Sequence, residues 1–162
     1  MNIKSYSKSQ LNILVLLRIL IGWHFLYEGV LKVYNPEWTA EGYLMSSQGI
    51  FRPFFQWLAS DGLIGIVDAA NIVILLFVGI ALIAGILERP AAFAGFVLLF
   101  LYYLAHPAFS GLDQGPVEGN YWLVNKNLIE GVALLALYYF PTSEAFGLKR
   151  LFGKKEKELA NV

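Results

Sequence analysis

The sequence contains no cysteine, only two histidines and few charged residues for its length. Without cysteine the chain cannot hold a disulfide, a Cys-ligated iron–sulfur cluster, a Cys-type zinc site or a thiol nucleophile. Charged residues make up 15% of its 162 residues, whereas soluble domains carry about a quarter. The formal net charge is zero and the basic residues are dispersed, which excludes the concentrated basic face of a nucleic-acid-binding protein.

The chain contains long apolar runs, and 57% of its residues are hydrophobic. A membrane-spanning helix needs about 20 apolar residues, because the hydrocarbon layer is about 30 Å thick. Four runs meet or approach that length, at residues 11–33, 63–87, 91–105 and 122–140. We therefore predict an all-α integral membrane four-helix bundle, made by a single transmembrane domain over residues 1–148.

The distribution of basic residues predicts the orientation in the membrane. Lysine and arginine gather at the N-terminus, at the turn near Arg89 and in residues 149–162, while acidic residues dominate the other two loops. Cytoplasmic flanks retain positive charge, so both termini are predicted to lie in the cytoplasm, with 149–162 as a basic cytoplasmic tail. The first run starts like a signal peptide but lacks a small-residue cleavage site, and we interpret it as an uncleaved anchor.

A short aromatic segment lies between the first two runs. Phe51, Phe54, Phe55 and Leu58 recur at helical spacing, with Trp57 beside them. This stripe predicts a short interfacial helix on the outer membrane face. An ordinary belt of aromatic residues at the interface explains the same pattern equally well.

The first run carries charged residues where lipid would be expected. At about 100° per residue, Arg18, His24, Glu28 and Lys32 fall on one face about 120° wide. A charge at the bilayer centre costs at least about 2.5 kcal/mol, so this face should look into the bundle. Lys32 lies near the outer end and has snorkelling to the interface as an alternative.

Polar residues in the other runs supply partners at similar depth, about 8 to 12 Å from the outer surface for Asp68, Asn127 and Glu130. They are Asp68, Asn71, His106, Asn125, Lys126, Asn127 and Glu130. Together they predict a pocket in the outer half of the bundle for a small polar or anionic molecule. A purely structural polar network, or a local ion pair between Lys126 and Glu130, is the alternative. Arg18 lies near the cytoplasmic end, where either a structural pair or a lipid-headgroup anchor would explain it.

The two histidines raise the question of a metal or haem. A neutral imidazole is a common axial ligand of haem iron. His24 and His106 have no supporting motif, however, and lone histidines more often pack or carry protons. We expect neither a haem nor a metal site.

Three motifs follow one another along the chain. The first run contains Arg18-x3-Gly22-x2-Phe25-x3-Gly29-x2-Lys32. The third ends with Tyr102-Tyr103-Leu104-Ala105-His106-Pro107. The fourth opens with Gly119-Asn120-Tyr121, followed by Asn125-Lys126-Asn127-Leu128-Ile129-Glu130. In this order the motifs resemble the DoxX/DoxD-like family of small four-helix membrane proteins, over about residues 11 to 140.

The resemblance implies a multi-pass protein of the bacterial or archaeal cytoplasmic membrane, related to the membrane subunit of thiosulfate:quinone oxidoreductase. That enzyme oxidises thiosulfate to tetrathionate, passes electrons to the quinone pool and has a second subunit. On this interpretation the partners are membrane lipid, a small anionic or quinone-like ligand and a second redox subunit. A small-solute carrier and a non-catalytic membrane anchor for a redox partner remain alternatives, so catalysis by this chain stays open.

Each polar residue of the predicted pocket receives a role under this interpretation. The catalytic group comprises Glu28, Glu130, His24 and His106, of which the carboxyl groups and His24 would relay protons. Substrate binding is assigned to Lys32, Asp68, Asn71, Asn125, Lys126 and Asn127, since buried ammonium groups are strong donors to anions. Tyr102, Tyr103 and Trp122 would wall a quinone ring.

Overall fold

A computed structural model describes residues 6–109 and 120–148. Within these residues the secondary structure is helical apart from one short antiparallel ribbon. The helices are α1 (Lys8–Tyr34), α2 (Glu41–Met45), α3 (Arg52–Leu58), α4 (Ile64–Ala84), α5 (Glu88–Ala105) and α6 (Lys126–Tyr139). The ribbon pairs β1 (Asn120–Tyr121) with β2 (Val124–Asn125).

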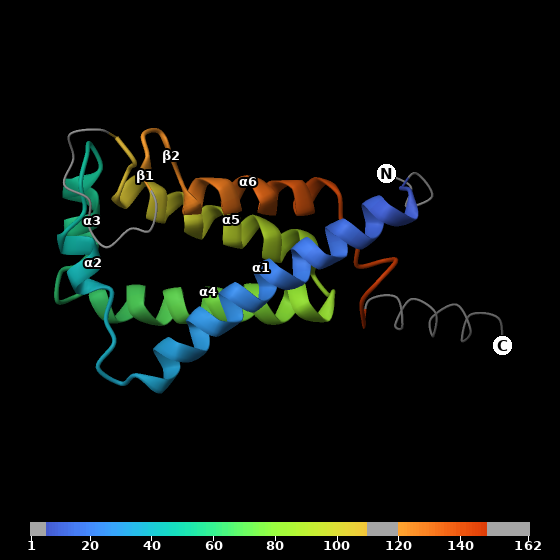
Figure 1. Ribbon diagram of the computed structural model, residues 1–162. Coiled ribbons are helices and arrows are strands. Elements are labelled where there is room, and N and C mark those ends of the chain that lie inside the picture. The colour runs from blue at the N-terminus through green and yellow to red at the C-terminus, as the bar shows by residue number, and fades with distance from the viewer. Residues whose placement is uncertain (1–5, 110–119, 149–162) are drawn as a thin grey trace.

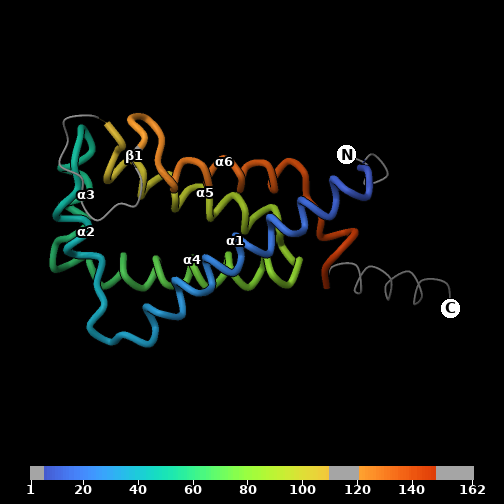
Figure 2. The backbone as a smooth tube through the Cα atoms, in the orientation of Figure 1, coloured from blue at the N-terminus to red at the C-terminus, as the bar shows by residue number. Residues whose placement is uncertain are grey.

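Four longer helices pack together, and the short elements gather at one end of them (Figure 1). α5 and α6 lie side by side opposite α4, and α1 crosses obliquely (Figure 2). α1 packs chiefly on α4, whereas it meets α6 over few residues. We call the end that carries α2, α3 and the ribbon the loop end, and the end that carries the α4–α5 connection the turn end.

Local sequence signals explain where α1 and α4 begin and end. Ser7 and Gln10 form a capping box at the start of α1, which places the first turn at Lys8 rather than at the predicted residue 11. α4 ends at Gly85, whose φ of 65° is a left-handed conformation that glycine adopts without penalty. A Cβ atom at Gly85 would lie only 2.7 Å from Cα of Gly147, so the chain after α6 packs directly on this turn.

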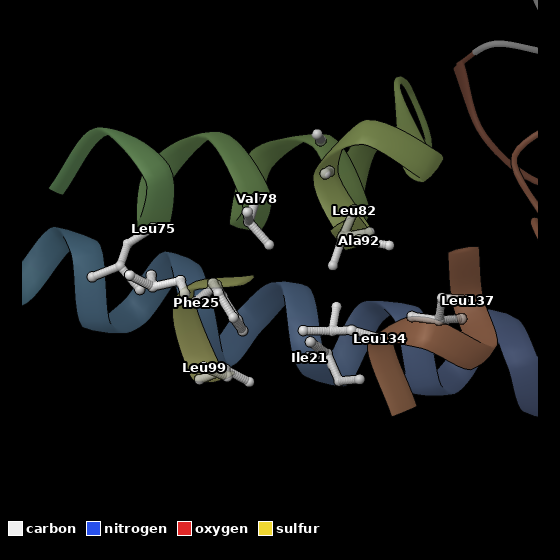
Figure 3. Packing of buried hydrophobic residues seen from close by; sticks show 12 residues of the cluster. Ile21, Phe25, Leu75, Val78, Leu82, Ala92, Leu99, Leu134 and Leu137 are labelled. Atoms are coloured by element: carbon white, nitrogen blue, oxygen red, sulfur yellow. The ribbon is translucent and has the colours of Figure 1, made fainter. Parts of the chain in front are cut away.

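The core lies between the four longer helices, and all of them contribute to it (Figure 3). Phe25 of α1, Val78 and Leu82 of α4, and Leu134 and Leu137 of α6 are almost completely buried. α1 and α4 approach most closely at Gly79, where an added Cβ atom would meet the Leu26 backbone nitrogen at 2.5 Å. Small residues thus let these backbones touch, as in other membrane helix pairs.

Three of the described helices can span a membrane by length and composition, namely α1, α4 and α5. Their outer faces carry exposed large apolar side chains such as Leu20, Trp23, Val73 and Phe93. An apolar surface of this extent is typical of a protein that lies in lipid.

The fourth predicted span is shorter than expected. Helix α6 begins at Lys126 instead of residue 122, because Asn120 pairs with Asn125 in the ribbon. Trp122 adopts a φ of 68°, which is incompatible with a helix. The Asn125 side chain then caps the helix by accepting a hydrogen bond from the Leu128 amide. Its fourteen residues rise only about 20 Å.

The aromatic segment between α1 and α4 forms two helices, α2 and α3, and its predicted stripe is divided. Phe55 is buried in a second cluster with Ala40, Leu44 and Ala105, whereas Phe51 and Phe54 are exposed. The side chains of α3 therefore serve both to cover the loop end of the bundle and to face outward.

The two ends of the described chain meet at the turn end. The rings of Tyr6 and Phe140 lie 6.4 Å apart, and Thr142 contacts Glu88 in the first turn of α5. The start of α1 and the segment after α6 thus share one end, in agreement with an even number of crossings. The predicted tail at 149–162 and Gly119 of the third motif lie outside the described residues.

Candidate functional site

A cavity of about 340 Å³ lies at the loop end, between the four longer helices and the chain that follows α1. It is lined by charged, amide and aromatic side chains together with a few aliphatic ones. The lining residues are His24, Phe25, Glu28, Lys32, Trp38, Thr39, Ala40, Tyr43, Asn71, Leu75, Leu99, Tyr102, Lys126 and Asn127. The volume falls in the range of small-molecule sites, about 300 to 1,000 Å³.

Helix α1 supplies the charged wall of the cavity, because one face of the helix repeats every four residues. Lys32 Nζ donates to Glu28 Oε2 at 2.9 Å, and this pair faces the cavity. The same ammonium group lies 5.1 Å from the centre of the Trp38 ring, in a cation–π contact. Lys32 therefore has two partners beside the cavity that it lines.

His24 and Glu130 connect α1 with α6. The distance between His24 Nδ1 and Glu130 Oε1 is 2.7 Å. His24 lines the cavity, while Glu130 lies behind it and lines a separate groove on the other side. Since α1 and α6 meet over few residues, this pair links two helices that share little packing.

Asn71, Tyr102 and Tyr43 form a hydrogen-bonded wall opposite α1. Asn71 Nδ2 donates to the Tyr102 hydroxyl, and the Tyr43 hydroxyl donates to the Tyr102 backbone oxygen at 3.1 Å. Asn71 Oδ1 is buried and accepts no hydrogen bond from any described residue. Burial raises the pKa of Tyr43, with Tyr102 adding to the effect, so its phenol stays a neutral donor.

Several predicted site residues lie outside the cavity lining and have local partners. Asp68 Oδ1 accepts from the Ala40 amide at 2.8 Å, which fixes the chain that enters α2. Asn125 caps α6, and the Tyr103 hydroxyl donates to the Leu123 backbone oxygen. Trp122 is two-thirds exposed in the ribbon turn. The structure thus does not bring Asp68, Asn125, Tyr103 or Trp122 to the cavity, although Asp68 supports its rim.

His106 also lies outside the cavity lining, just beyond the end of α5. Its Nε2 atom is 3.2 Å from the Ser46 hydroxyl, and its ring lies 4.3 Å from that of Tyr43. Burial lowers the pKa of His106, partly offset by the contact with Ser46, so the ring is held neutral. The predicted catalytic histidine therefore packs behind Tyr43, one layer from the cavity.

Arg18 belongs to a separate buried network at the turn end. Its guanidinium donates to the Thr142 hydroxyl at 2.8 Å and lies 3.6 Å from Glu88 Oε2. Glu88 also accepts from the backbone amides of Thr142 and Ser143. Of the two explanations offered for Arg18, the structure shows the structural pair.

Sequence reasoning missed the part of the cavity that comes from the loop. Trp38, Thr39 and Tyr43 follow the first span and show no helical periodicity that would indicate a shared face. The one feature of the sequence that could have indicated this part of the cavity is the presence of aromatic residues close to the end of a span. Phe25, Leu75 and Leu99 line the cavity as well, but a sequence does not distinguish such residues from ordinary core.

Comparison with known proteins gives one match. The DoxX family model matches residues 13–107, which is more than half of the chain. No curated protein and no solved structure matches the chain. The matched region covers α1 from residue 13 onward and all of α2 to α5, while Lys126 and Glu130 lie beyond it. The chain therefore belongs to the DoxX family of membrane proteins.

Proposed function

We propose that this protein is a quinone-coupled redox protein of the bacterial inner membrane, with thiosulfate or another small sulfur anion as electron donor. The observation that carries the proposal is the composition of the cavity. It places the ammonium groups of Lys32 and Lys126 beside the rings of Trp38 and Tyr102, within about 340 Å³. Cationic donors attract a small dianion, while aromatic and aliphatic walls suit a planar ring.

The cavity residues fit a quinone. Its two oxygens only accept hydrogen bonds in the oxidised form, and Lys32, Lys126 and the amide of Asn127 are donors on the cavity wall. In the reduced form its hydroxyl groups donate, and the Glu28 carboxylate on the cavity wall is an acceptor for them. Leu75 and Leu99 supply the apolar part of the wall.

The proposed reaction balances without any group beyond the two substrates. Two thiosulfate ions give up one electron each and join through a new sulfur–sulfur bond, yielding tetrathionate. A bound quinone supplies an acceptor for two electrons and two protons. Glu28 is well placed to pass protons from water, because its side chain is 43% exposed while it lines the cavity. Lys32 holds that carboxylate in position at 2.9 Å.

Placement in the membrane is part of the proposal. The outer face of α6 carries Ile129, Val132 and Tyr139, each more than half exposed, which supports α6 as a short fourth span. With four spans, both termini would lie in the cytoplasm and the cavity in the outer half of the bilayer. The basic residues at the N-terminus and around Arg89 support this orientation.

Quinone reduction by the purified protein with thiosulfate tests the proposal, alone and together with the product of a neighbouring redox-subunit gene. We expect thiosulfate-dependent bleaching of a quinone analogue, and a loss of at least tenfold in Lys32→Gln. Lys8→Gln is the matched control, because Lys8 is exposed and starts α1 at the turn end. A folded protein that neither binds nor reduces quinone in either preparation would refute the proposal.

The two alternatives give different outcomes in the same preparations. A small-solute carrier would accumulate labelled thiosulfate in proteoliposomes without oxidising it. A membrane anchor would retain its partner in Glu28→Gln and Lys32→Gln variants, with no change except in stability.

A further inference from the structure

A second hollow, of about 520 Å³, lies between α1 and α6. Its walls are aliphatic, with Leu17, Leu20 and Ile21 from α1 and Ile129 and Ala133 from α6. Leu20 and Ile129 are each more than half exposed. The hollow is therefore a groove on the outer surface between α1 and α6, the surface that would meet lipid.

The groove exists because α1 and α6 diverge. α1 packs on α4, and α6 packs on α5, so the ribbons of α1 and α6 separate toward the loop end (Figure 1). The groove has lining residues from both helices, and Tyr121 of β1 lines it as well.

The groove adjoins the polar cavity. Lys126 lines both hollows. His24 lines the cavity, Glu130 lines the groove, and the two side chains meet at 2.7 Å. The boundary between the two hollows is thus a pair of polar side chains and not a layer of packed core.

From this arrangement we infer that the cavity takes its ligand sideways from the bilayer, and that the ligand is an amphiphile with a hydrocarbon tail. Its polar ring lies in the cavity, and its tail lies in the groove between α1 and α6. The inference rests on the proposed function, since a tailed quinone is such an amphiphile. A water-soluble ligand alone would leave the aliphatic groove without a role. Relative to water, each buried methylene strengthens binding about fourfold; relative to lipid, the gain comes from van der Waals contacts of the tail with the groove walls.

The test compares a ubiquinone ring carrying a decyl tail with the same ring lacking the tail, in nanodiscs of fixed lipid content. Binding is followed by quenching of tryptophan fluorescence, and Trp38→Phe identifies the signal from the cavity, because Trp38 lines it. After correction for partitioning into lipid, we expect the tailed ring to bind at least tenfold more tightly than the tail-free ring.

Variants in the groove make the test specific. Ala133→Phe fills the groove and should bring the ratio of the two affinities close to one, with tail-free binding changed less than twofold. Val132→Phe is the matched control, because Val132 is the adjacent residue of α6, is 57% exposed and does not line the groove. Should Ala133→Phe fail to fold, Ile129→Gln serves, since Ile129 is exposed and lines the groove.

The outcomes separate the two proposals. Wild-type protein that binds neither ring removes the quinone function and this inference together. Equal affinity for both rings, or a tail effect that survives Ala133→Phe or Ile129→Gln, overturns the sideways path while the quinone function stands. If a phospholipid co-purifies in the groove and the tailed ring does not displace it, the sideways path is overturned as well.

Discussion

Single side chains at the turn end determine whether the first and last helices stay together. Glu88 is buried and accepts from two backbone amides while it lies 3.6 Å from Arg18. We predict that Glu88→Ala destabilises the protein by about 3–5 kcal/mol, because it leaves the Arg18 guanidinium buried without a counter-charge. Thermal unfolding in detergent measures the loss.

The adjacent Arg89 provides a control for this prediction. Arg89 is exposed, so Arg89→Met should change stability by about 0.5 kcal/mol at most. The double variant Arg18→Met with Glu88→Met should be less destabilised than the sum of the two single variants. If the effects simply add, Arg18 and Glu88 do not act as a pair.

His106 gives a pH dependence at the same scale. Because burial lowers its pKa in the folded protein, the unfolded chain takes up a proton first as the pH falls. The stability that the neutral ring contributes is present above about pH 6.5, the ordinary histidine pKa, and is lost below it. Thermal unfolding between pH 7.5 and 5 should show a smaller pH-dependent loss in His106→Gln than in the wild type. An unchanged slope would exclude His106 as its source.

The sequence predicted many of the residues that line the cavity, but not all of them. The spacing of His24, Glu28 and Lys32 places them on one helical face, and the cavity contains all three. The partner of Arg18 was missed because Glu88 stands at a predicted turn, where an acidic residue is usually an exposed helix start. Asp68 was assigned to the pocket from its helical face and depth, and His106 from depth, neither of which reveals that each has a loop partner.

At the scale of elements, the glycine that lies closest to the partner backbone in the contact between α1 and α4 is Gly79. A Cβ atom at Gly79 would meet the Leu26 backbone at 2.5 to 2.7 Å. Backbone cannot rotate aside, so Gly79→Ala should force the helices apart and cost about 1–3 kcal/mol. Gly65→Ala in the same helix meets nothing within 4 Å and should be neutral or stabilising. Comparable melting temperatures for the two variants would contradict this packing.

The elements themselves followed from apolar runs, with errors at the boundaries. α1, α4 and α5 overlap the predicted runs closely, because long apolar segments have few alternatives to a helix. The predicted start of the last helix at residue 122 was wrong, because Asn120 pairs with Asn125 in the ribbon and hydrophobic periodicity does not reveal this pairing. α2 was not predicted, because five residues are too short to show a helical repeat.

For the whole molecule, the absence of native cysteine allows topology to be measured directly. Single cysteines at exposed positions of the two ends should react with an impermeant maleimide from opposite sides of the membrane. We expect labelling in intact cells at Glu37, Asp61 and Tyr121, and labelling only after permeabilisation at Lys8, Arg89 and Leu148. Labelling of Leu148 in intact cells would rule out a cytoplasmic position for the segment after α6.

The ion pair at the turn end also bears on how the chain is made. Arg18 is translated before both of its partners: its counter-charge Glu88 comes with α5, and Thr142, to which it donates, follows it by 124 residues. The guanidinium group therefore lacks a counter-charge until α5 is made, and lacks its hydrogen bond until the segment after α6 is made. Synthesis of the segment after α6 should therefore stabilise the inserted first helix. Truncated chains that end before Thr142 should be degraded preferentially by membrane proteases.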